Sequence, residues 1–336
     1  MQAALDEASV SRYLQGLGLL APGEAGQVEP AGDGNINWVR RVRGASGRSF
    51  VVKQARPALE RFPEYRVTTD RLVFEARYFE VTAALDRGGV RPRVVHFDPG
   101  ARVLVLEDLG AAERLDHALA RGADVAAALR ALAAFLGAVH AGTRDPSLAD
   151  RFGNREMQRL HGDHVFHLPY RENDFPLSPA LRARAEQIWR DADLIARIDA
   201  AYRRYLLPRG ALVHGDAQAG NVLLAERGPV LLDAEIAHVG DPAFDLGILL
   251  AHVLLPGIVR GEQARSEAAV RDVYESYAEA HGAAGLCERA DVMRYAGIEV
   301  LRRTLGAARV PVVVADAAGL AAVEAGVRLV RGEPEI

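Results

Sequence analysis

One short segment limits what this chain can fold into more than any other. An apolar stretch at 211–213 leads into the loop 214–221, His-Gly-Asp-Ala-Gln-Ala-Gly-Asn, and a second apolar run follows at 222–224. The small residues of the loop allow a sharp backbone turn. The pattern therefore predicts two strands joined by a turn, with Asp216 at the end of the first strand and Asn221 at the start of the second.

A hairpin extends this pattern. Residues 226–229, Glu-Arg-Gly-Pro, have the composition of a turn, and the apolar run 230–232 ends at Asp233. We expect this run to return antiparallel and to place Asp233 beside Asn221. Glu235 follows two positions later. Amide and carboxylate oxygens, together with phosphates and water, suit Mg²⁺, so Asn221, Asp233 and Glu235 are candidate metal ligands.

This arrangement is typical of a phosphoryl-transfer site. In such a site one carboxylate accepts the proton of a hydroxyl group, while an amide and a second carboxylate hold the magnesium on the nucleotide phosphates. Asp216 is the candidate catalytic base. A second His-Gly-Asp occurs at 161–163, but Leu168 occupies the position that corresponds to Asn221 and no second acid-bearing hairpin follows. We interpret that copy as unrelated to catalysis.

Composition excludes several other classes of protein. The chain has 336 residues, 49% of them hydrophobic and 26% charged, which fits a globular enzyme of two lobes. Its net charge of -4 and the lack of a basic run give no reason to expect nucleic acid binding. A single cysteine excludes an intrachain disulfide and a multi-cysteine zinc site. The acidic N-terminus and the absence of an 18-residue apolar run favour a cytoplasmic protein without a membrane span.

The order of predicted elements indicates an α+β fold with two lobes like those of protein kinases. The N-terminal elements are a helix at 6–19, strands at 37–42 and 49–54, a helix at 70–85, strands at 94–97 and 101–106, and a connector at 107–110. The C-terminal helices are expected at 112–120, 125–142, 179–191, 193–205, 245–255, 263–282, 288–305 and 315–331. The helices 179–191 and 193–205 are close enough to form one continuous helix. We expect a small β-rich lobe at 1–107, a larger helical lobe at 108–336, and a nucleotide in the cleft between them.

The N-terminal lobe holds further candidates for nucleotide binding. Lys53 is the only lysine of the chain and follows the apolar residues 50–52, where it can reach phosphates. Glu75, on the next helix, is the expected partner of Lys53, in preference to Glu80. The Gly-rich turn at 31–37 contains Asn35 and Asn37, and its backbone amides can cover phosphates. Glu107, at the start of the connector, is a further nucleotide-binding candidate.

Two acids, Asp241 and Asp245, follow the hairpin, and two arginines lie near the C-terminus. Asp245 opens a helix and is interpreted either as a cap or as a residue that orients the amides of the catalytic loop. Arg302 and Arg303 are adjacent in a helix and point about 100° apart, so geometry alone expects only one of them to face a given pocket. Without further information they indicate a solvated helix face.

Four stretches resemble the aminoglycoside phosphotransferase-like kinase superfamily and, within it, the methylthioribose kinase family. They are 33–37 with 52–55, Phe-Gly-Asn-Arg-Glu-Met at 152–157, the catalytic hairpins, and Glu-Val-Leu-Arg-Arg-Thr-Leu-Gly at 299–306. The resemblance implies a kinase fold, ATP and Mg²⁺ as cofactors, and a small molecule with a hydroxyl group as the substrate. It also implies that Arg302 and Arg303 face a sugar and that Asp233 and Glu235 are the acidic metal ligands.

The departures from the family pattern leave alternatives open. The loop after Asp216 reads Ala-Gln-Ala-Gly-Asn, where the family has a sequence closer to Leu-His-Thr-Gly-Ser, and the chain is short for that family. An amino-sugar or amino-alcohol kinase would need carboxylates in the substrate cleft, such as Asp163, Glu172 or Asp174. A nucleotide-binding pseudokinase is disfavoured by the intact Lys53 and Asp216. The sequence also leaves open which hydroxyl group is phosphorylated, whether the nucleotide is ATP or GTP, and whether the protein is a monomer or a homodimer.

Overall fold

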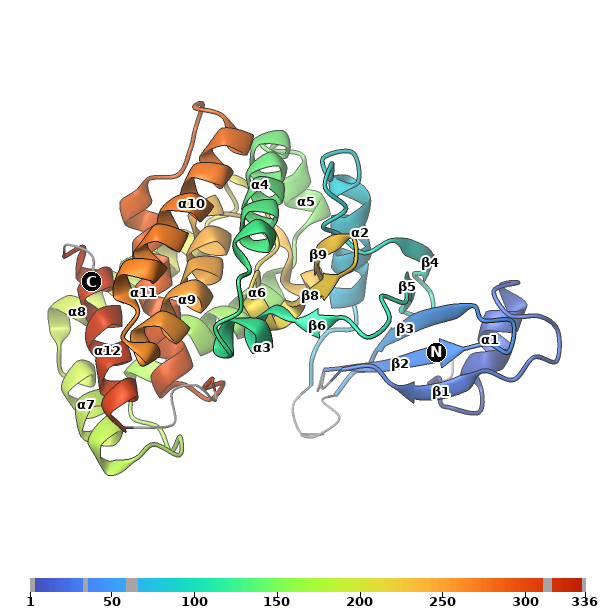
Figure 1. Cartoon of the computed structure of the whole chain (residues 1–336), viewed down its shortest axis with the longest axis horizontal. Coiled ribbons are helices and arrows are strands. Elements are labelled where there is room, and N and C mark those ends of the chain that lie inside the picture. Colours follow the sequence, from blue (N-terminus) through green and yellow to red (C-terminus); the bar gives the residue numbers. More distant parts are fainter. Residues whose placement is uncertain (1–3, 33–35, 59–65, 311–315, 334–336) are drawn as a thin grey trace.

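The computed structural model describes residues 4–32, 36–58, 66–310 and 316–333. Figure 1 shows an antiparallel sheet with its flanking helices at one end of the molecule and a bundle of helices at the other. The predicted α+β class, with a small β-rich N-terminal part and a larger helical part, is confirmed.

Five antiparallel strands form the N-terminal sheet, in the order β1-β2-β3-β5-β4. The strands are β1 (Gln27–Pro30), β2 (Asn37–Arg43), β3 (Ser49–Ala55), β4 (Val94–Asp98) and β5 (Val103–Glu107). Two helices flank the sheet, α1 (Val10–Gly16) and α2 (Arg71–Thr82). The predicted hairpin of β2 and β3 is confirmed, and its turn contains Gly47 at a φ of 81°, which glycine adopts without steric cost.

Both faces of this sheet are covered by other elements, as the alternating side chains of β5 show. Successive residues of a strand point to opposite faces. Val103 and Val105 pack in the cluster that includes α1, whereas Leu104 and Leu106 belong to the main core with α2. Burial of a side chain of this size stabilises the fold by about 1.5–3 kcal/mol. Lys53 lies directly opposite Leu104 across the strand pair, so it shares the face that α2 covers.

The C-terminal part is mainly helical. Its helices are α3 (Leu115–Ala120), α4 (Ala126–Gly142), α5 (Leu148–Arg151), α6 (Arg155–Phe166), α7 (Pro179–Trp189), α8 (Ala192–Tyr205), α9 (Pro242–Arg260), α10 (Gln263–His281), α11 (Arg289–Leu305) and α12 (Asp316–Arg331). Helix α9 contacts α4, α10, α11 and α12. It is the one helix of the described residues that is long and apolar enough to cross a membrane, with a mean hydropathy of 1.8, but 94% of that window is buried, as in the core helix of a globular protein.

Two small sheets lie within the C-terminal part. β7 (Ala211–Val213) pairs with β10 (His238–Gly240), and β8 (Val222–Ala225) pairs with β6 (Glu113–Arg114) and β9 (Gly228–Leu231). The predicted antiparallel return of the second hairpin strand is confirmed, because Val222 lies opposite Leu231 and the amide of Leu232 donates to the carbonyl of Asn221 at 2.8 Å.

Several predicted boundaries were wrong for local reasons. The first helix begins only at Val10, because the side chains of Asp6 and Ser9 close a turn before it. The predicted helix at 112–120 begins at Leu115, because residues 113–114 pair with β8. Between 179 and 205, by contrast, the two predicted helices are confirmed and the alternative of one continuous helix is wrong, because Asp191 caps the second by accepting from the amide of Leu194 at 3.0 Å.

Helix α6 was not predicted at all. Its buried face contains histidine, glutamine and glycine among the apolar residues, which hides the helical period. Gly162 is needed there, because a Cβ atom would lie 2.6 Å from the ring of Tyr202 on α8. The second His-Gly-Asp therefore lies within a helix, which confirms that it is no copy of the catalytic loop.

Candidate active site

Strand β7 delivers the loop that carries Asp216. Gly215 has a φ of 84°, and a Cβ atom there would lie 2.7 Å from the carbonyl oxygen of Ile236, so this position accepts only glycine without strain. Asp216 Oδ2 accepts hydrogen bonds from Gln218 Nε2 and Asn221 Nδ2, both at 2.8 Å. These bonds fix one carboxylate oxygen, whereas Oδ1 is buried and has no hydrogen-bond partner among the described residues.

Asp245 fixes the backbone of this loop through hydrogen bonds to two of its amides. Its two carboxylate oxygens accept the amides of His214 at 2.6 Å and Gly215 at 2.9 Å. His140 Nε2 lies 3.2 Å from the same carboxylate. Burial opposes the charge, but these contacts outweigh it and hold the pKa of Asp245 below the ordinary aspartate value. The interpretation that Asp245 orients the loop amides is confirmed, while Asp241 caps α9 by accepting from the amide of Ala243.

The Lys53 cluster, defined as Lys53, Glu75 and Asp233, joins the sheet to the hairpin. Lys53 Nζ lies 2.7 Å from Glu75 Oε2 and 2.5 Å from Asp233 Oδ1. The predicted pairing with Glu75 is confirmed, since Glu80 is exposed and lies near Arg151 instead. Burial would lower the pKa of Lys53, but the two carboxylates raise it above its ordinary value, so the ammonium stays charged.

Asp233 has an unusual backbone conformation for this position. Its φ of 64° and ψ of 49° are left-handed, and it is one of two described residues other than glycine with a positive φ. Such strain in a non-glycine residue costs on the order of 1–3 kcal/mol and is concentrated at functional sites. The Asp233 side chain is 49% exposed, so one of its oxygens stays accessible beside Lys53.

Glu235 and Asn37 lie together at the edge of the site. Asn37 Nδ2 donates to Glu235 Oε2 at 2.7 Å, and Asn37 Oδ1 accepts from Arg71 Nε at 3.1 Å. Arg71 Nε is also 3.5 Å from Glu235 Oε2. Both amide atoms of Asn37 and one oxygen of Glu235 therefore hold the sheet to the hairpin, and the nucleotide and metal roles of these two residues stay predictions.

The two remaining nucleotide-binding candidates are placed differently. The Glu107 carboxylate accepts from Arg227 Nη1 at 2.9 Å and Nη2 at 2.6 Å, so its side chain ties β5 to the β8–β9 turn. A nucleotide contact through the Glu107 side chain would have to break this pair. Asn35 lies outside the described residues.

The oxygen donors of this site determine whether it suits Mg²⁺. No group of three or more His, Cys, Asp or Glu side chains in the described part of the chain is arranged as a metal site. The residues still fit a Mg²⁺ ion held largely by phosphates, because the amide nitrogen of Asn221 is engaged with Asp216, which leaves the amide oxygen for a cation, and the Asp233 side chain is 49% exposed.

Arg302 and Arg303 are buried at the end of α11 rather than solvated. Arg302 Nη1 lies 3.0 Å from Glu299 Oε2, and Arg303 Nε lies 2.6 Å from Glu299 Oε1. Arg303 Nη2 also donates to Gln218 Oε1 at 2.5 Å. The expectation that only one arginine could face a given pocket was wrong, because the long side chains converge on the carboxylate one turn earlier.

This arginine pair acts on the electrostatics of Asp216. Burial alone would raise the pKa of Asp216, but the neighbouring Arg302 and Arg303 and the Gln218 bond lower it below its ordinary value. Asp216 is therefore ionised at neutral pH and can accept a proton.

His161 was missed as a site residue by the sequence interpretation. Its Nε2 lies 3.6 Å from Asp216 Oδ1, and the side chain is 7% exposed. Burial, together with Arg302, lowers the pKa of His161 to about 3, so the ring is neutral. The only signal in the sequence was the His-Gly-Asp at 161–163, which was judged by its likeness to the catalytic loop and not by its place in the fold.

The acids considered for a cationic substrate are otherwise engaged or exposed. Asp163 Oδ1 lies 3.0 Å from both His167 Nδ1 and the hydroxyl of Tyr202. Glu172 and Asp174 are exposed in the segment after residue 170. None of the three is among the groups that act on the charge of Asp216.

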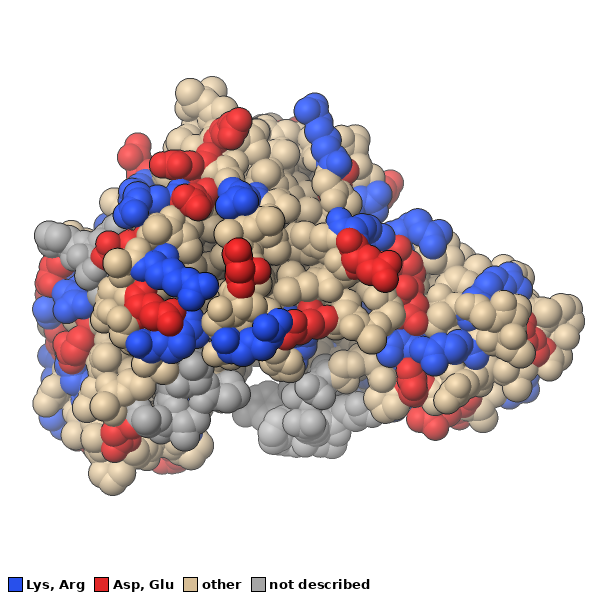
Figure 2. All heavy atoms as spheres, in the orientation of Figure 1, with Lys and Arg blue, Asp and Glu red and all other residues tan. Residues whose placement is uncertain are grey.

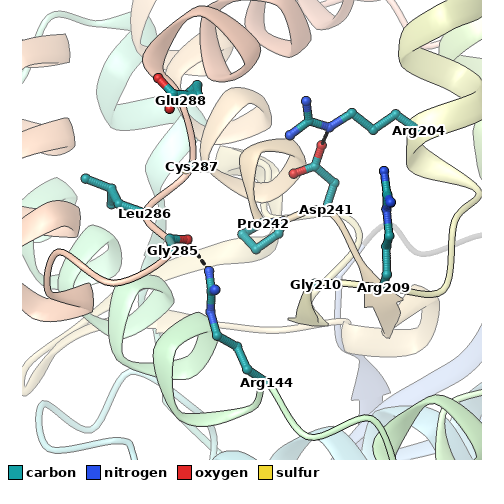
Figure 3. A pocket seen from close by; sticks show the side chains of 10 residues that line it. All are labelled: Arg144, Arg204, Arg209, Gly210, Asp241, Pro242, Gly285, Leu286, Cys287 and Glu288. Carbon is teal, nitrogen blue, oxygen red and sulfur yellow. Dashed lines mark hydrogen bonds and ion pairs between the residues drawn. The ribbon is translucent and has the colours of Figure 1, made fainter.

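A cavity of about 380 Å³ is lined by Arg209 and Gly210, just before β7, and by Asp241 and Pro242 at the start of α9 (Figure 3). Its charged groups hold one another, since Arg204 pairs with Asp241 and Arg144 donates to the carbonyl of Gly285. Burial raises the pKa of the Cys287 thiol in its wall to about 11, so the thiol is protonated at neutral pH. These contacts explain the cavity as part of the scaffold around the start of α9. Over the face in Figure 2, basic and acidic side chains are interspersed.

Comparisons with known proteins agree with this site. The fold and the loop define a phosphotransferase that acts on hydroxyl groups of small molecules. The chain belongs to the phosphotransferase enzyme family, whose model matches residues 27–282, and a kinase family implies the use of ATP.

Methylthioribose kinases are among the most similar relatives. The enzyme of Geobacillus sp. (strain WCH70) is 28% identical over 331 residues, with 88% of this chain and 81% of the relative covered. That of Klebsiella pneumoniae subsp. pneumoniae is 30% identical over 292 residues, with 80% and 71% covered. The resemblance to this family is confirmed.

Solved structures show the same fold. The choline kinase LicA of Streptococcus pneumoniae has a TM-score of 0.54 at 15% identity, with 97% of this chain and 98% of that chain covered. The ethanolamine kinase of Plasmodium vivax also has a TM-score of 0.54, at 11% identity, with 94% and 86% covered.

Proposed function

We propose that this kinase transfers the γ-phosphoryl group of ATP to a hydroxyl group of an uncharged sugar of the methylthioribose type. The relatives named methylthioribose kinase support this substrate class. The observation that carries the proposal is the position of the arginine pair: Arg303 Nη2 donates to Gln218 Oε1 at 2.5 Å, and Gln218 Nε2 donates to Asp216 Oδ2 at 2.8 Å. Two guanidinium groups beside the catalytic carboxylate repel a cationic acceptor and can donate hydrogen bonds to sugar oxygens.

The charges around the acceptor support an uncharged substrate over an amino compound. Glu299 is neutralised by Arg302 and Arg303, and Asp163 is bonded to His167 and Tyr202. A choline-like or aminoglycoside substrate would need a free carboxylate near its ammonium group. Asp216 is also an acid in this region, but it is required for the chemistry.

In the proposed reaction, Asp216 accepts the proton of the acceptor hydroxyl as its oxygen attacks the γ-phosphorus. The bond from phosphorus to the β–γ bridging oxygen breaks, and ADP leaves with that electron pair. Lys53 faces the phosphates and offsets their charge. Asn221 and Asp233 would hold Mg²⁺, with Glu235 as a further acid nearby, and the ion would supply charge stabilisation to the phosphates. The protein acts mainly through position and electrostatics, because the loose transition state needs little covalent help.

The test is release of ADP by the purified protein with ATP and magnesium. The acceptors are methylthioribose, ribose, choline, homoserine and several aminoglycosides, and the Asp216→Asn variant is the control. Turnover with methylthioribose that disappears in the variant supports the proposal. Turnover with choline or an aminoglycoside and none with methylthioribose would overturn the substrate class while leaving the kinase chemistry intact.

A further inference from the structure

His161 is a buried histidine that no structural contact accounts for. Both ring nitrogens are buried and have no hydrogen-bond partner among the described residues, and the ring packs edge-on against Phe244. A buried polar atom without a partner costs on the order of 1–3 kcal/mol, so an apolar side chain would serve the resting fold better. Such a residue in a native fold requires an explanation.

An unpartnered nitrogen of His161, Nε2, lies near an unpartnered oxygen of Asp216, Oδ1. Nε2 and Asp216 Oδ1 are 3.6 Å apart, too far for a good hydrogen bond, and Oδ1 also has no partner in the part of the chain that the structure describes. Two atoms at this separation can both lie about 2.8 Å from a single oxygen. One hydroxyl group between them can donate to Oδ1 and accept from Nε2.

The neighbours of His161 favour such a hydrogen-bonding role over a charged one. The charge of Arg302 disfavours a positive charge on the ring, and Asp216 is already held by Gln218 and Asn221 through its other oxygen. The neutral imidazole can therefore bind a hydroxyl oxygen without competing for the proton that Asp216 receives.

We propose that His161 is a positioning residue that holds the acceptor hydroxyl against Asp216. The inference rests on the proposed function, because it concerns the acceptor that Asp216 activates. The hydrogen bond from Nε2 occupies one lone pair of the acceptor oxygen while the hydroxyl proton points at Oδ1. The second lone pair is then free to attack, so the hydroxyl is held in a single orientation.

The test compares His161→Phe with His161→Gln in the purified full-length enzyme. Phenylalanine keeps a ring beside Phe244 but forms no hydrogen bond, whereas the amide of glutamine can still bind a hydroxyl group. For His161→Phe we expect kcat/KM for the acceptor to fall about 10- to 100-fold, the KM for ATP to stay unchanged, and the melting temperature to stay equal or rise. His161→Gln should recover a large part of the lost kcat/KM.

His281 provides a matched control. It is also a buried histidine, but its Nδ1 lies 2.9 Å from the carbonyl of Gly282 and its Nε2 lies 3.3 Å from Arg144 Nη2. His281→Phe should lower the melting temperature and leave kcat/KM for the acceptor unchanged. The two variants thus separate loss of stability from loss of positioning.

The outcomes separate this inference from the proposed function. If the wild-type enzyme phosphorylates none of the acceptors, the proposed function fails. If the wild-type enzyme is active and His161→Phe keeps its full kcat/KM, the positioning role alone is overturned. A drop in melting temperature with equal losses in the kinetics of acceptor and ATP would show instead that His161 is structural.

Discussion

Around Lys53 each buried charge faces an opposite charge, whereas around Asp216 three buried polar atoms of the described residues have no hydrogen-bond partner. Lys53 Nζ lies 2.7 Å from Glu75 Oε2 and 2.5 Å from Asp233 Oδ1, although the second Glu75 oxygen, Oε1, has no hydrogen-bond partner among the described residues. Asp216 Oδ1 and the His161 ring have no such contact among the described residues. The difference teaches that the phosphate side of this site is assembled by the fold, while the acceptor side is completed by the substrate.

This contrast has an energetic consequence. Removing one member of a paired buried cluster leaves an uncompensated charge and costs stability. Removing a group that has no partner costs the resting fold little, and its effect is confined to turnover. Substitutions in the two regions should therefore differ in whether stability and activity change together.

The largest effect is expected at Asp216. Asp216→Asn keeps the shape of the side chain but cannot accept the hydroxyl proton, so kcat should fall about 10²- to 10⁴-fold. The melting temperature should hardly change, because the amide oxygen can still accept from Asn221. Steady-state ADP release and thermal unfolding measure the two quantities, and a variant that stays fully active would exclude Asp216 as the base.

The Lys53 cluster should show the opposite behaviour in stability. Lys53→Met leaves the fully buried Glu75 without its cation, so unfolding should become easier by about 3–5 kcal/mol. Adding Glu75→Gln removes the orphan charge and should recover most of that loss.

Activity should stay low in the double variant, because the phosphates still lack their ammonium group. Urea unfolding and ADP release of the single and double variants provide the measurement. Full recovery of both stability and turnover in the double variant would contradict the role of Lys53.

Asp245 should produce an intermediate effect, because it acts on catalysis through the loop backbone. Asp245→Asn places an amide group against the amides of His214 and Gly215, so one of these donors loses its acceptor. We expect a loss of about 1–3 kcal/mol in unfolding free energy and a fall in kcat, with the KM for ATP unchanged.

Asp241, four residues earlier, is the matched control for Asp245. Asp241→Asn keeps a good capping residue on α9 and loses the ion pair with Arg204. Its kcat should match that of the wild-type enzyme. Equal kcat values for the two variants would exclude a positioning role for Asp245.

The local part of this site could be predicted from the sequence. Asn221 and Asp233 are brought together by one tight hairpin, and Lys53 meets Glu75 because a strand is followed directly by the helix that covers its face. Contacts between consecutive elements can be predicted because the hydrophobic period of each element and the composition of the turn between them are both visible in the sequence.

The long-range part could not be predicted. His161 reaches Asp216 across 55 positions, from a helix whose period is hidden by polar residues and a glycine. Glu107 meets Arg227 across 120 positions, and Glu235 meets Asn37 across 198. Such contacts depend on how helices and sheets pack together, and no local pattern of the chain records that packing.

The smallest expected effect is a difference in pH dependence between the KM for ATP and kcat. It again separates the region around Lys53 from the region around Asp216. Burial raises the pKa of Glu75 above the ordinary glutamate value of about 4.3, although Lys53 reduces the rise. The pKa of Asp216 is lowered instead. As the pH falls from neutral, Glu75 should therefore take up a proton and lose its ion pair with Lys53 while Asp216 is still ionised. The KM for ATP should rise a few-fold on the acid side, and kcat should stay nearly level until a lower pH.

Glu75→Gln isolates this titration, because the protonation of ATP itself is the same for both enzymes. The ratio of the two KM values for ATP, measured between about pH 5 and 8, should approach one at the acid end, where Glu75 of the wild-type enzyme is neutral like glutamine. At the alkaline end the wild-type enzyme should have the lower KM, because only its carboxylate holds Lys53 in place. A ratio that does not change with pH would mean that Glu75 keeps its charge throughout, and that Lys53 is held with the same strength over the whole range.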